Sequence, residues 1–134
     1  MASYYDSVPG APTLDPRVYL RLEVGNGDIE ILAMVDTAAP WCVLDPSLVG
    51  ALGSRLEDLP DRAILSSRLG RFSGRLYRGT TTILAEKGVD LTIETTFFLS
   101  PDWPAGNFMG YQGFLERFRF AVDPAMNRFY FGSL

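Results

Sequence analysis

The sequence contains no histidine and a single cysteine, Cys42. The lack of histidine excludes the Ser–His and Cys–His pairs that many nucleophilic enzymes use. One cysteine without histidine also argues against a structural zinc site, and it excludes a disulfide within the chain. A lone thiol in an apolar segment suits a reducing compartment, so we expect a cytoplasmic location. Among the side chains that commonly catalyse hydrolysis, the carboxylates remain.

Long apolar runs and an excess of positive charge are missing too. No apolar run approaches the roughly 20 residues that span a bilayer, and the first residues lack the basic and apolar regions of a signal peptide. The net charge is −4, which argues against a nucleic-acid partner. We therefore expect neither nucleic acid nor membrane as a partner. With 47% hydrophobic residues, the 134-residue chain is expected to fold around its own core.

Short segments of alternating apolar and polar residues dominate the sequence. Residues 18–24 alternate cleanly, the Gly-Asn-Gly-Asp sequence at 25–28 is typical of a hairpin turn, and residues 29–35 form the expected partner strand. The other strands expected from the same signals are 63–67, 72–85, 89–97, 118–122 and 129–131. Many short strands and little helix predict an all-β, barrel-like fold of one domain, residues 17–134.

The segments between the strands are expected to be turns, short helices and an arm. Asp45 and Pro46 can begin a short helix, because Asp caps helix N-termini and Pro suits the first helical position. Residues 58–61 are expected to form a loop. Residues 1–16 contain several prolines and show no periodicity, so we expect a flexible N-terminal arm.

One acid lies within the most apolar part of the chain. Asp36 directly follows the apolar segment 29–35 and precedes Thr37 and Ala38, after which a second apolar segment covers 41–44. Removing an unpaired carboxylate from water costs several kcal/mol or shifts its pKa. Asp36 is therefore either a solvated turn residue or a carboxylate kept there for its chemistry, and the sequence around it is compatible with both.

Three segments of the sequence, taken in their order along the chain, resemble the motifs of a known protein family. They are Asp36-Thr37-Ala38, the later Phe108-Met109-Gly110, and a short helical stretch at 113–117. Together they resemble retropepsin-like aspartic proteases, single-domain proteins of the cellular or bacterial type, over roughly residues 17–132. The resemblance implies a retropepsin-like closed barrel with a flap hairpin and one short C-terminal helix. Within it, 108–110 would pack behind the Asp36 loop, although this segment is equally compatible with a core strand ending in a turn.

The resemblance also implies an activity and a set of site residues. The activity is that of an aspartic endopeptidase, a hydrolase that acts on a peptide or protein substrate and needs neither metal nor organic cofactor. The implied catalytic residues are Asp36, Thr37 and Ala38. The residues at the flap tip, which would bind substrate, are Leu69, Gly70 and Arg71; without the resemblance, the same turn could belong to an ordinary surface hairpin.

A dimer is expected because hydrolysis by carboxylates needs two of them, one ionised and one protonated. The sequence holds one Asp-Thr-small motif, so a second copy has to supply the second carboxylate. Viral members of the family brace their dimer with an ion pair, and Pro40 and Tyr111 stand at the corresponding positions here. We therefore expect a homodimer that is weak, braced in another way, or formed only with substrate.

Other interpretations stay open. Ala38 replaces the usual glycine of the motif, and together with Pro40 and Tyr111 this leaves a non-catalytic dimerisation or peptide-binding module as the main alternative. An unrelated small β-barrel with Asp36 in a turn is a further one. The arginines between 62 and 78 either favour acidic substrates or protect the edge of an exposed hairpin, as charged residues often do.

Overall fold

The computed structural model describes residues 2–3, 18–25, 29–123, 125–126 and 128–134, and strands make up most of them. The predicted turn at 26–28 lies outside the described residues, as do residues 4–17 of the expected flexible arm. Near the start of that arm, Ala2–Ser3 form a two-residue strand that pairs with the last strand of the chain. The flexibility of the rest of the arm stays a prediction.

The strands are β1 (Ala2–Ser3), β2 (Tyr19–Val24), β3 (Ile29–Val35), β4 (Cys42–Val43), β5 (Glu57–Ser67), β6 (Gly70–Ile83), β7 (Leu91–Leu99), β8 (Phe108–Met109), β9 (Phe118–Asp123) and β10 (Arg128–Ser133). The short helical segments are η1 (Pro46–Leu48), α1 (Val49–Leu52), η2 (Gly53–Arg55) and η3 (Leu115–Arg117). Each strand expected from the sequence overlaps an observed strand, although β5 begins before the expected residue 63 and β7 begins after the expected residue 89.

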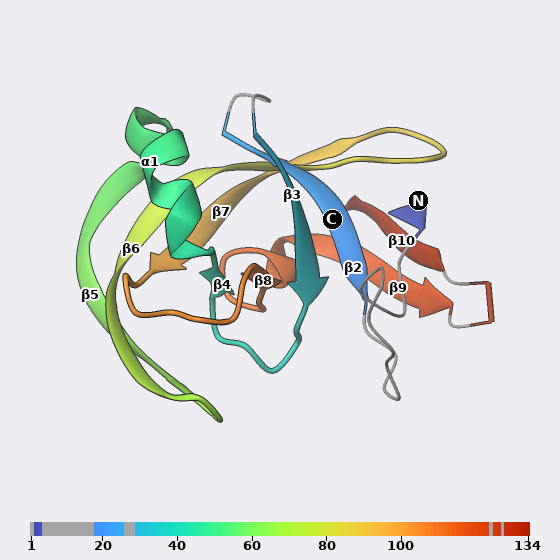
Figure 1. The fold of residues 1–134 in the computed structure, drawn as a ribbon. Helices are drawn as coiled ribbons and strands as arrows, with labels where there is room; N and C mark the ends of the chain where they lie inside the picture. Colours follow the sequence, from blue (N-terminus) through green and yellow to red (C-terminus); the bar gives the residue numbers. More distant parts are fainter. Residues whose placement is uncertain (1, 4–17, 26–28, 124, 127) are drawn as a thin grey trace.

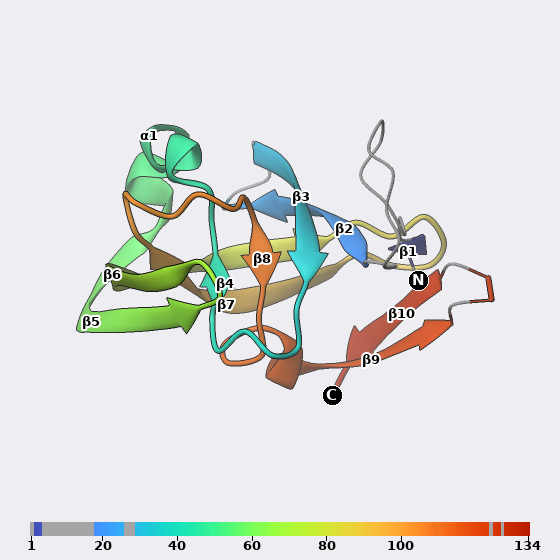
Figure 2. The same cartoon turned by 60° about the horizontal axis from the view of Figure 1, so that its bottom comes forward.

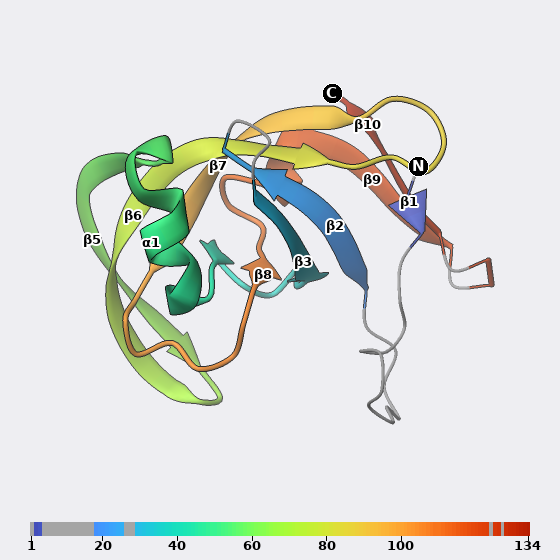
Figure 3. The same cartoon turned by 45° about the horizontal axis from the view of Figure 1, so that its top comes forward.

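Two sheets organise these strands. The larger has seven strands in the order β2-β3-β8-β4-β7-β6-β5, and β2 additionally pairs with β6. Most neighbours in this sheet are antiparallel, whereas β3 and β8, and β4 and β7, are parallel. The smaller sheet has the order β1-β10-β9. Figures 1 and 3 show the long, curved β5–β6 hairpin on one side of the molecule and the β9–β10 hairpin on the opposite side.

The first hairpin supplies much of the core. Leu20, Leu22 and Val24 of β2 are completely buried, and on the paired strand β3 Ile31 and Ala33 are buried as well. The alternation at 18–24 therefore predicts the buried face correctly. Burial of one leucine of this kind contributes roughly 1.5–3 kcal/mol to stability, so this face anchors the strand that leads to Asp36.

The long β5–β6 hairpin begins earlier than the sequence pattern predicts. The loop predicted at 58–61 is wrong, because these residues belong to β5. A shift in the β5–β6 register between Asp58 and Arg62 takes up the irregularity around Pro60. Proline, which has no N–H to donate, is tolerated at such a bulge and on an edge strand, and β5 is the last strand of its sheet.

The helical segments are short. As predicted, Asp45 caps η1: its carboxylate accepts a hydrogen bond from the backbone N–H of Ser47 (2.9 Å), which lowers the pKa of Asp45. The helix predicted at 113–117 is a single 3₁₀ turn, η3. The described α-helix, α1, follows η1 instead. In the described part of the chain, no helix is long and apolar enough to cross a membrane.

β8 lies between β3 and β4, which are themselves connected by the loop that contains Asp36 (Figure 2). Gly110 directly follows β8 and is buried. A Cβ atom at this position would lie 2.3 Å from the carbonyl oxygen of Trp41 and 2.6 Å from that of Ala39. Such distances are shorter than non-bonded contacts allow. The predicted close packing of 108–110 behind the Asp36 loop is therefore confirmed, and it depends on glycine.

Replacing Gly110 by alanine should destabilise the fold. The two oxygens that its methyl group would meet belong to the backbone, so the chain itself must move, and we expect the free energy of unfolding to fall by about 1–3 kcal/mol or more. Gly50→Ala is the matched control, because Gly50 is exposed in α1 with open space around it. There, alanine should leave stability unchanged or raise it by up to about 1 kcal/mol. Urea unfolding followed by tryptophan fluorescence measures both; an unchanged midpoint for Gly110→Ala would contradict the close approach.

Candidate active site

Asp36 stands directly after β3, and its own loop orients it. Its backbone N–H donates to the carbonyl oxygen of Met109 (3.0 Å), and its carbonyl oxygen accepts from the N–H of Ala39 (3.2 Å). The carboxylate oxygen Oδ1 accepts a hydrogen bond from the backbone N–H of Ala38 (3.0 Å). Backbone groups thus fix one oxygen of a carboxylate that is itself only half-buried.

The Asp36 loop is fastened to the segment that follows β8. The N–H of Tyr111 donates to the carbonyl oxygen of Ala39, and the N–H of Gln112 donates to that of Pro40, each at 2.9 Å. With the close approach at Gly110, these bonds hold the loop against a segment from the far end of the sequence. Pro40 and Tyr111 each take part in one of these bonds through their backbone, but they do not bond to each other.

Asn107, which no sequence pattern singles out, supports the same region. Its side-chain oxygen accepts from the N–H of Asp45 (2.8 Å), and its side-chain NH₂ donates to the carbonyl oxygen of Leu32 (3.3 Å). Its backbone carbonyl accepts from the N–H of Met34 (3.0 Å). Asn107 therefore ties β3 to the start of η1 just before β8 begins.

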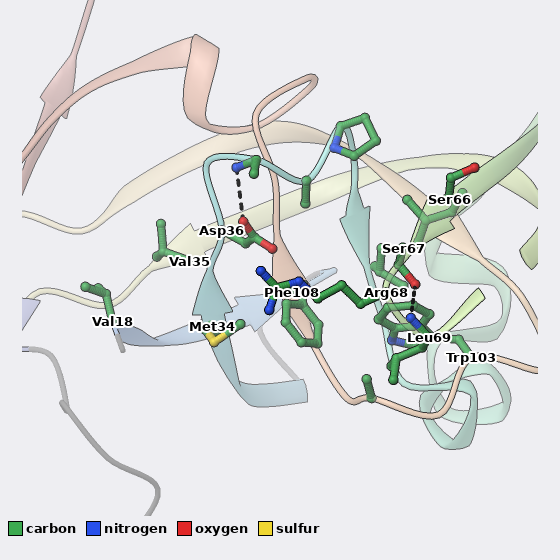
Figure 4. Close-up of a pocket in the computed structure, with 16 residues that line it drawn as sticks. Val18, Met34, Val35, Asp36, Ser66, Ser67, Arg68, Leu69, Trp103 and Phe108 are labelled. Atoms are coloured by element: carbon green, nitrogen blue, oxygen red, sulfur yellow. Dashed lines mark hydrogen bonds between the residues drawn. The ribbon is translucent and has the colours of Figure 1, made fainter. Parts of the chain in front are cut away.

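Asp36 lies in a cleft of about 840 Å³. The Asp36 loop and the end of β3 form one side, and the tip of the β5–β6 hairpin forms the other (Figure 4). The residues that line the cleft are Val18, Met34, Val35, Asp36, Ala38, Ala39, Pro40, Val43, Leu65, Ser66, Ser67, Arg68, Leu69, Trp103, Ala105 and Phe108. Most of these side chains are apolar, and the two charged ones are Asp36 and Arg68.

Aromatic rings form one wall of the cleft. Trp103 is buried, and its ring packs edge-to-face against Phe72 of β6 (centroids 5.2 Å apart) and Phe108 of β8 (5.7 Å). Its indole N–H donates to the carbonyl oxygen of Gly106 (2.8 Å), which satisfies the one polar group of the ring. Trp103 therefore connects the hairpin to the strand behind Asp36, a role that its loop position in the sequence did not reveal.

The structure brings some of the expected site residues together and leaves others aside. Asp36, Ala38 and Leu69 all line the cleft. The cleft-lining residues, however, include neither Thr37 nor the Gly70 and Arg71 of the expected flap tip. Thr37 is exposed, and within the described residues its hydroxyl has no hydrogen-bond partner. Of the arginines between 62 and 78, for which the sequence left a role toward acidic substrates open, Arg68 is the one that lines the cleft.

The described residues offer no catalytic group in this region other than Asp36. They include no group of three or more His, Cys, Asp or Glu side chains able to hold a metal ion. Cys42, in β4 beside the Asp36 loop, is completely buried. Burial raises the pKa of its thiol from 9.0 to about 12, so almost no thiolate forms near neutral pH. Cys42 is thus a core residue rather than a nucleophile.

The fold is shared with a protein of known structure, although the sequence matches no protein-family model and no curated protein. Among solved structures, a retropepsin-like aspartic protease from Rickettsia conorii is similar, with a TM-score of 0.56 and 20% sequence identity. The similarity covers 84% of this chain and 89% of that one. It shows that the two chains share a fold, as the sequence resemblance implies.

The buried thiol of Cys42 predicts both slow labelling and a pH effect. In the native protein at pH 8, a thiol reagent should label Cys42 at least about a hundredfold more slowly than in denaturant, because thiolate and access are both lacking. Since the pKa in the folded state (about 12) lies above the ordinary value (9.0), this group's contribution to stability is complete below pH 9 and is lost as the pH rises toward 12. Ser73→Cys, at an exposed position, is the labelling control. Rapid stoichiometric labelling of the native wild type would show that Cys42 is accessible.

Proposed function

We propose that this chain is an aspartic endopeptidase of the retropepsin type, acting as a homodimer in which each copy contributes Asp36. One observation carries the proposal: the carboxylate of Asp36 is oriented by the N–H of Ala38 and faces a cleft shared with a hairpin tip. The fold similarity to the Rickettsia conorii protease supports it. The pairing of β2 with both β3 and β6 supports a closed barrel, with the β5–β6 hairpin as its flap.

The dimer follows from the number of carboxylates. Asp36 is the one acid among the described residues that line the cleft. A dyad therefore needs a second Asp36, which a twofold-symmetric dimer supplies. The exposed hydroxyl of Thr37 is then free to bond across the axis, which would help to hold the two Asp36 loops together.

The proposed chemistry follows from two carboxylates at short distance. Two like charges cannot both ionise cheaply there, so the pair shares one proton. The ionised carboxylate takes a proton from water as the water oxygen attacks the carbonyl carbon of the scissile bond, and the protonated carboxylate donates to the carbonyl oxygen. The tetrahedral intermediate then collapses: the C–N bond breaks, and the leaving nitrogen receives a proton from the dyad.

The local hydrogen bonds suit this chemistry. The Ala38 N–H occupies Oδ1 of Asp36, and within the described residues Oδ2 has no partner. Oδ2 is thus left for water or for the second carboxylate. Since the donor is a backbone group already in place, no reorganisation is needed as charge develops. Ala38 is exposed, so within one copy its methyl group meets no crowding.

The substrate proposed is an extended peptide bound beneath the hairpin as an added strand. The apolar walls, including Phe108 and Trp103, offer room for apolar side chains. Leu69 contacts this space directly, whereas Gly70 and Arg71 would reach the peptide only when the hairpin moves toward it. No metal and no organic cofactor takes part in the proposed mechanism.

Asp36→Asn should abolish proteolysis while preserving the fold. An asparagine side-chain oxygen can still accept the Ala38 N–H, but it cannot serve as acid or base, so we expect turnover of a library-derived peptide to fall by about a thousandfold or more. Asp61→Asn, the same change at an exposed position on β5, should leave turnover unchanged. The wild-type rate should be bell-shaped against pH, with its maximum in the acidic range. Undiminished cleavage by Asp36→Asn would refute the proposal, whereas peptide binding without cleavage by the wild type would favour the non-catalytic alternative.

Mixing wild type with an inactive variant should show that each copy contributes half of the active site. Adding an excess of Asp36→Asn to a fixed amount of wild type should lower activity, because mixed dimers hold one carboxylate, while adding Asp61→Asn should not. Specific activity should also fall on dilution and recover when saturating peptide favours the dimer by mass action. Sedimentation of the same samples reports the assembly. Constant specific activity from a species that sediments as a monomer would contradict the shared dyad.

A further inference from the structure

The described residues that line the cleft include one cation, and it belongs to the hairpin turn. Ser67 pairs with Gly70 at the end of the hairpin, so Arg68 and Leu69 form a two-residue turn between them. The hydroxyl of Ser67 accepts from the N–H of Leu69 (3.1 Å) and donates to the carbonyl oxygen of Gly70 (3.2 Å). The side chain of Arg68 extends from this braced turn into the cleft, toward the side where Asp36 and Phe108 lie (Figure 4).

Within the described part of the chain, Arg68 has no carboxylate partner, in contrast to Arg75 and Arg78 of the same hairpin. Arg75 pairs with Asp58 (3.0 Å), and Arg78 pairs with Glu94 (3.2 Å). Arg68 makes no ion pair with Asp36 or with any other acid of the described residues. Arg68 is exposed at the turn, so its guanidinium, which extends into a mostly apolar cleft without such an ion pair, is solvated by water.

A peptide that enters the cleft displaces that water. If an apolar or amide side chain of the peptide lies beside Arg68, the guanidinium loses hydrogen bonds that are not replaced. If a carboxylate lies there, two parallel charge-assisted hydrogen bonds can form, which match the geometry of the guanidinium. An enzyme discriminates strongly between two such peptides when the wrong one would leave a polar group of the site without a hydrogen-bond partner.

We infer that Arg68 is a specificity-determining residue that selects substrates with an Asp or Glu side chain close to the scissile bond. The inference rests on the proposed function and narrows its substrate class to acidic peptides with apolar neighbours. In a twofold-symmetric dimer both hairpins present an Arg68, so the preference applies on both sides of the scissile bond at equivalent positions.

The test starts from a peptide that the wild type cleaves, identified in an unbiased library. Glu, Gln or Lys replaces each residue within four positions of the cleaved bond, and kcat/KM is measured at about pH 5.5, where a glutamate side chain is ionised. We expect Glu to exceed Gln by about tenfold at one position on each side. This ratio should approach one in Arg68→Gln, and Arg68→Glu should transfer the preference to Lys.

Two controls separate specificity from structure. Arg62→Gln removes a cation from the same hairpin at an exposed position that does not line the cleft, and it should retain the Glu preference. In the wild type the Glu-to-Gln ratio should fall toward one below about pH 4, because the substrate carboxylate becomes protonated. A merely structural role of Arg68 would not produce this pH dependence. A wild-type ratio near one, or a preference that survives in Arg68→Gln, would overturn the inference.

Failure of the proposed function would be distinguishable from failure of this inference. If no library peptide is cleaved, the binding of fluorescein-labelled decapeptides that differ only in Glu or Gln is measured on Asp36→Asn and on the double variant Asp36→Asn, Arg68→Gln. Tighter binding of the Glu peptides that depends on Arg68 would support the inference without proteolysis. Equal binding of both peptides to both proteins would refute it.

Discussion

The structure depends on one close backbone approach, that of Gly110 to the loop that carries Asp36. At this point two carbonyl oxygens, of Ala39 and Trp41, occupy the space that any side chain would need. The approach allows β8 to enter between β3 and β4, and it brings Tyr111 within hydrogen-bond distance of the same loop. Next to this contact, the N–H of Asp36 donates to the carbonyl oxygen of Met109, so the backbone that carries the carboxylate is held in place from the same side.

Local patterns were sufficient to predict most of the longer strands, because strand formation depends largely on neighbouring residues. The alternation that buries Leu20 and Leu22 can be read directly, and so can the capping of η1 by Asp45. The order of the strands in the sheet could not be predicted from the sequence, because a two-residue strand such as β8 carries no pattern of its own. Pro60 led to the wrong prediction of a loop, because a bulge on an edge strand accommodates a proline that an inner strand would reject.

The candidate site, too, could be predicted from the sequence only in part. Asp36 stood out because a carboxylate after an apolar strand requires an explanation, and its motif carried the family resemblance. Trp103 did not stand out, and Arg68 could not be told apart from the other arginines between 62 and 78, because the place of both in the cleft depends on how the β5–β6 hairpin curves over the sheet. Asn107 gave no signal at all: its three contacts join segments far apart in the sequence, and nothing in its neighbours shows them.

The parallel pairing of β3 with β8 also has a consequence for the order of folding. Met34 pairs with Phe108, so the two strands are separated by most of the chain, and contacts of such high sequence separation form slowly because a large loop must close first. During synthesis, the segment around Asp36 emerges long before residues 108–112 are available to hold it. The orientation of this carboxylate is therefore a late event in the maturation of each copy, and a nascent or truncated chain would carry the acid without its supporting framework.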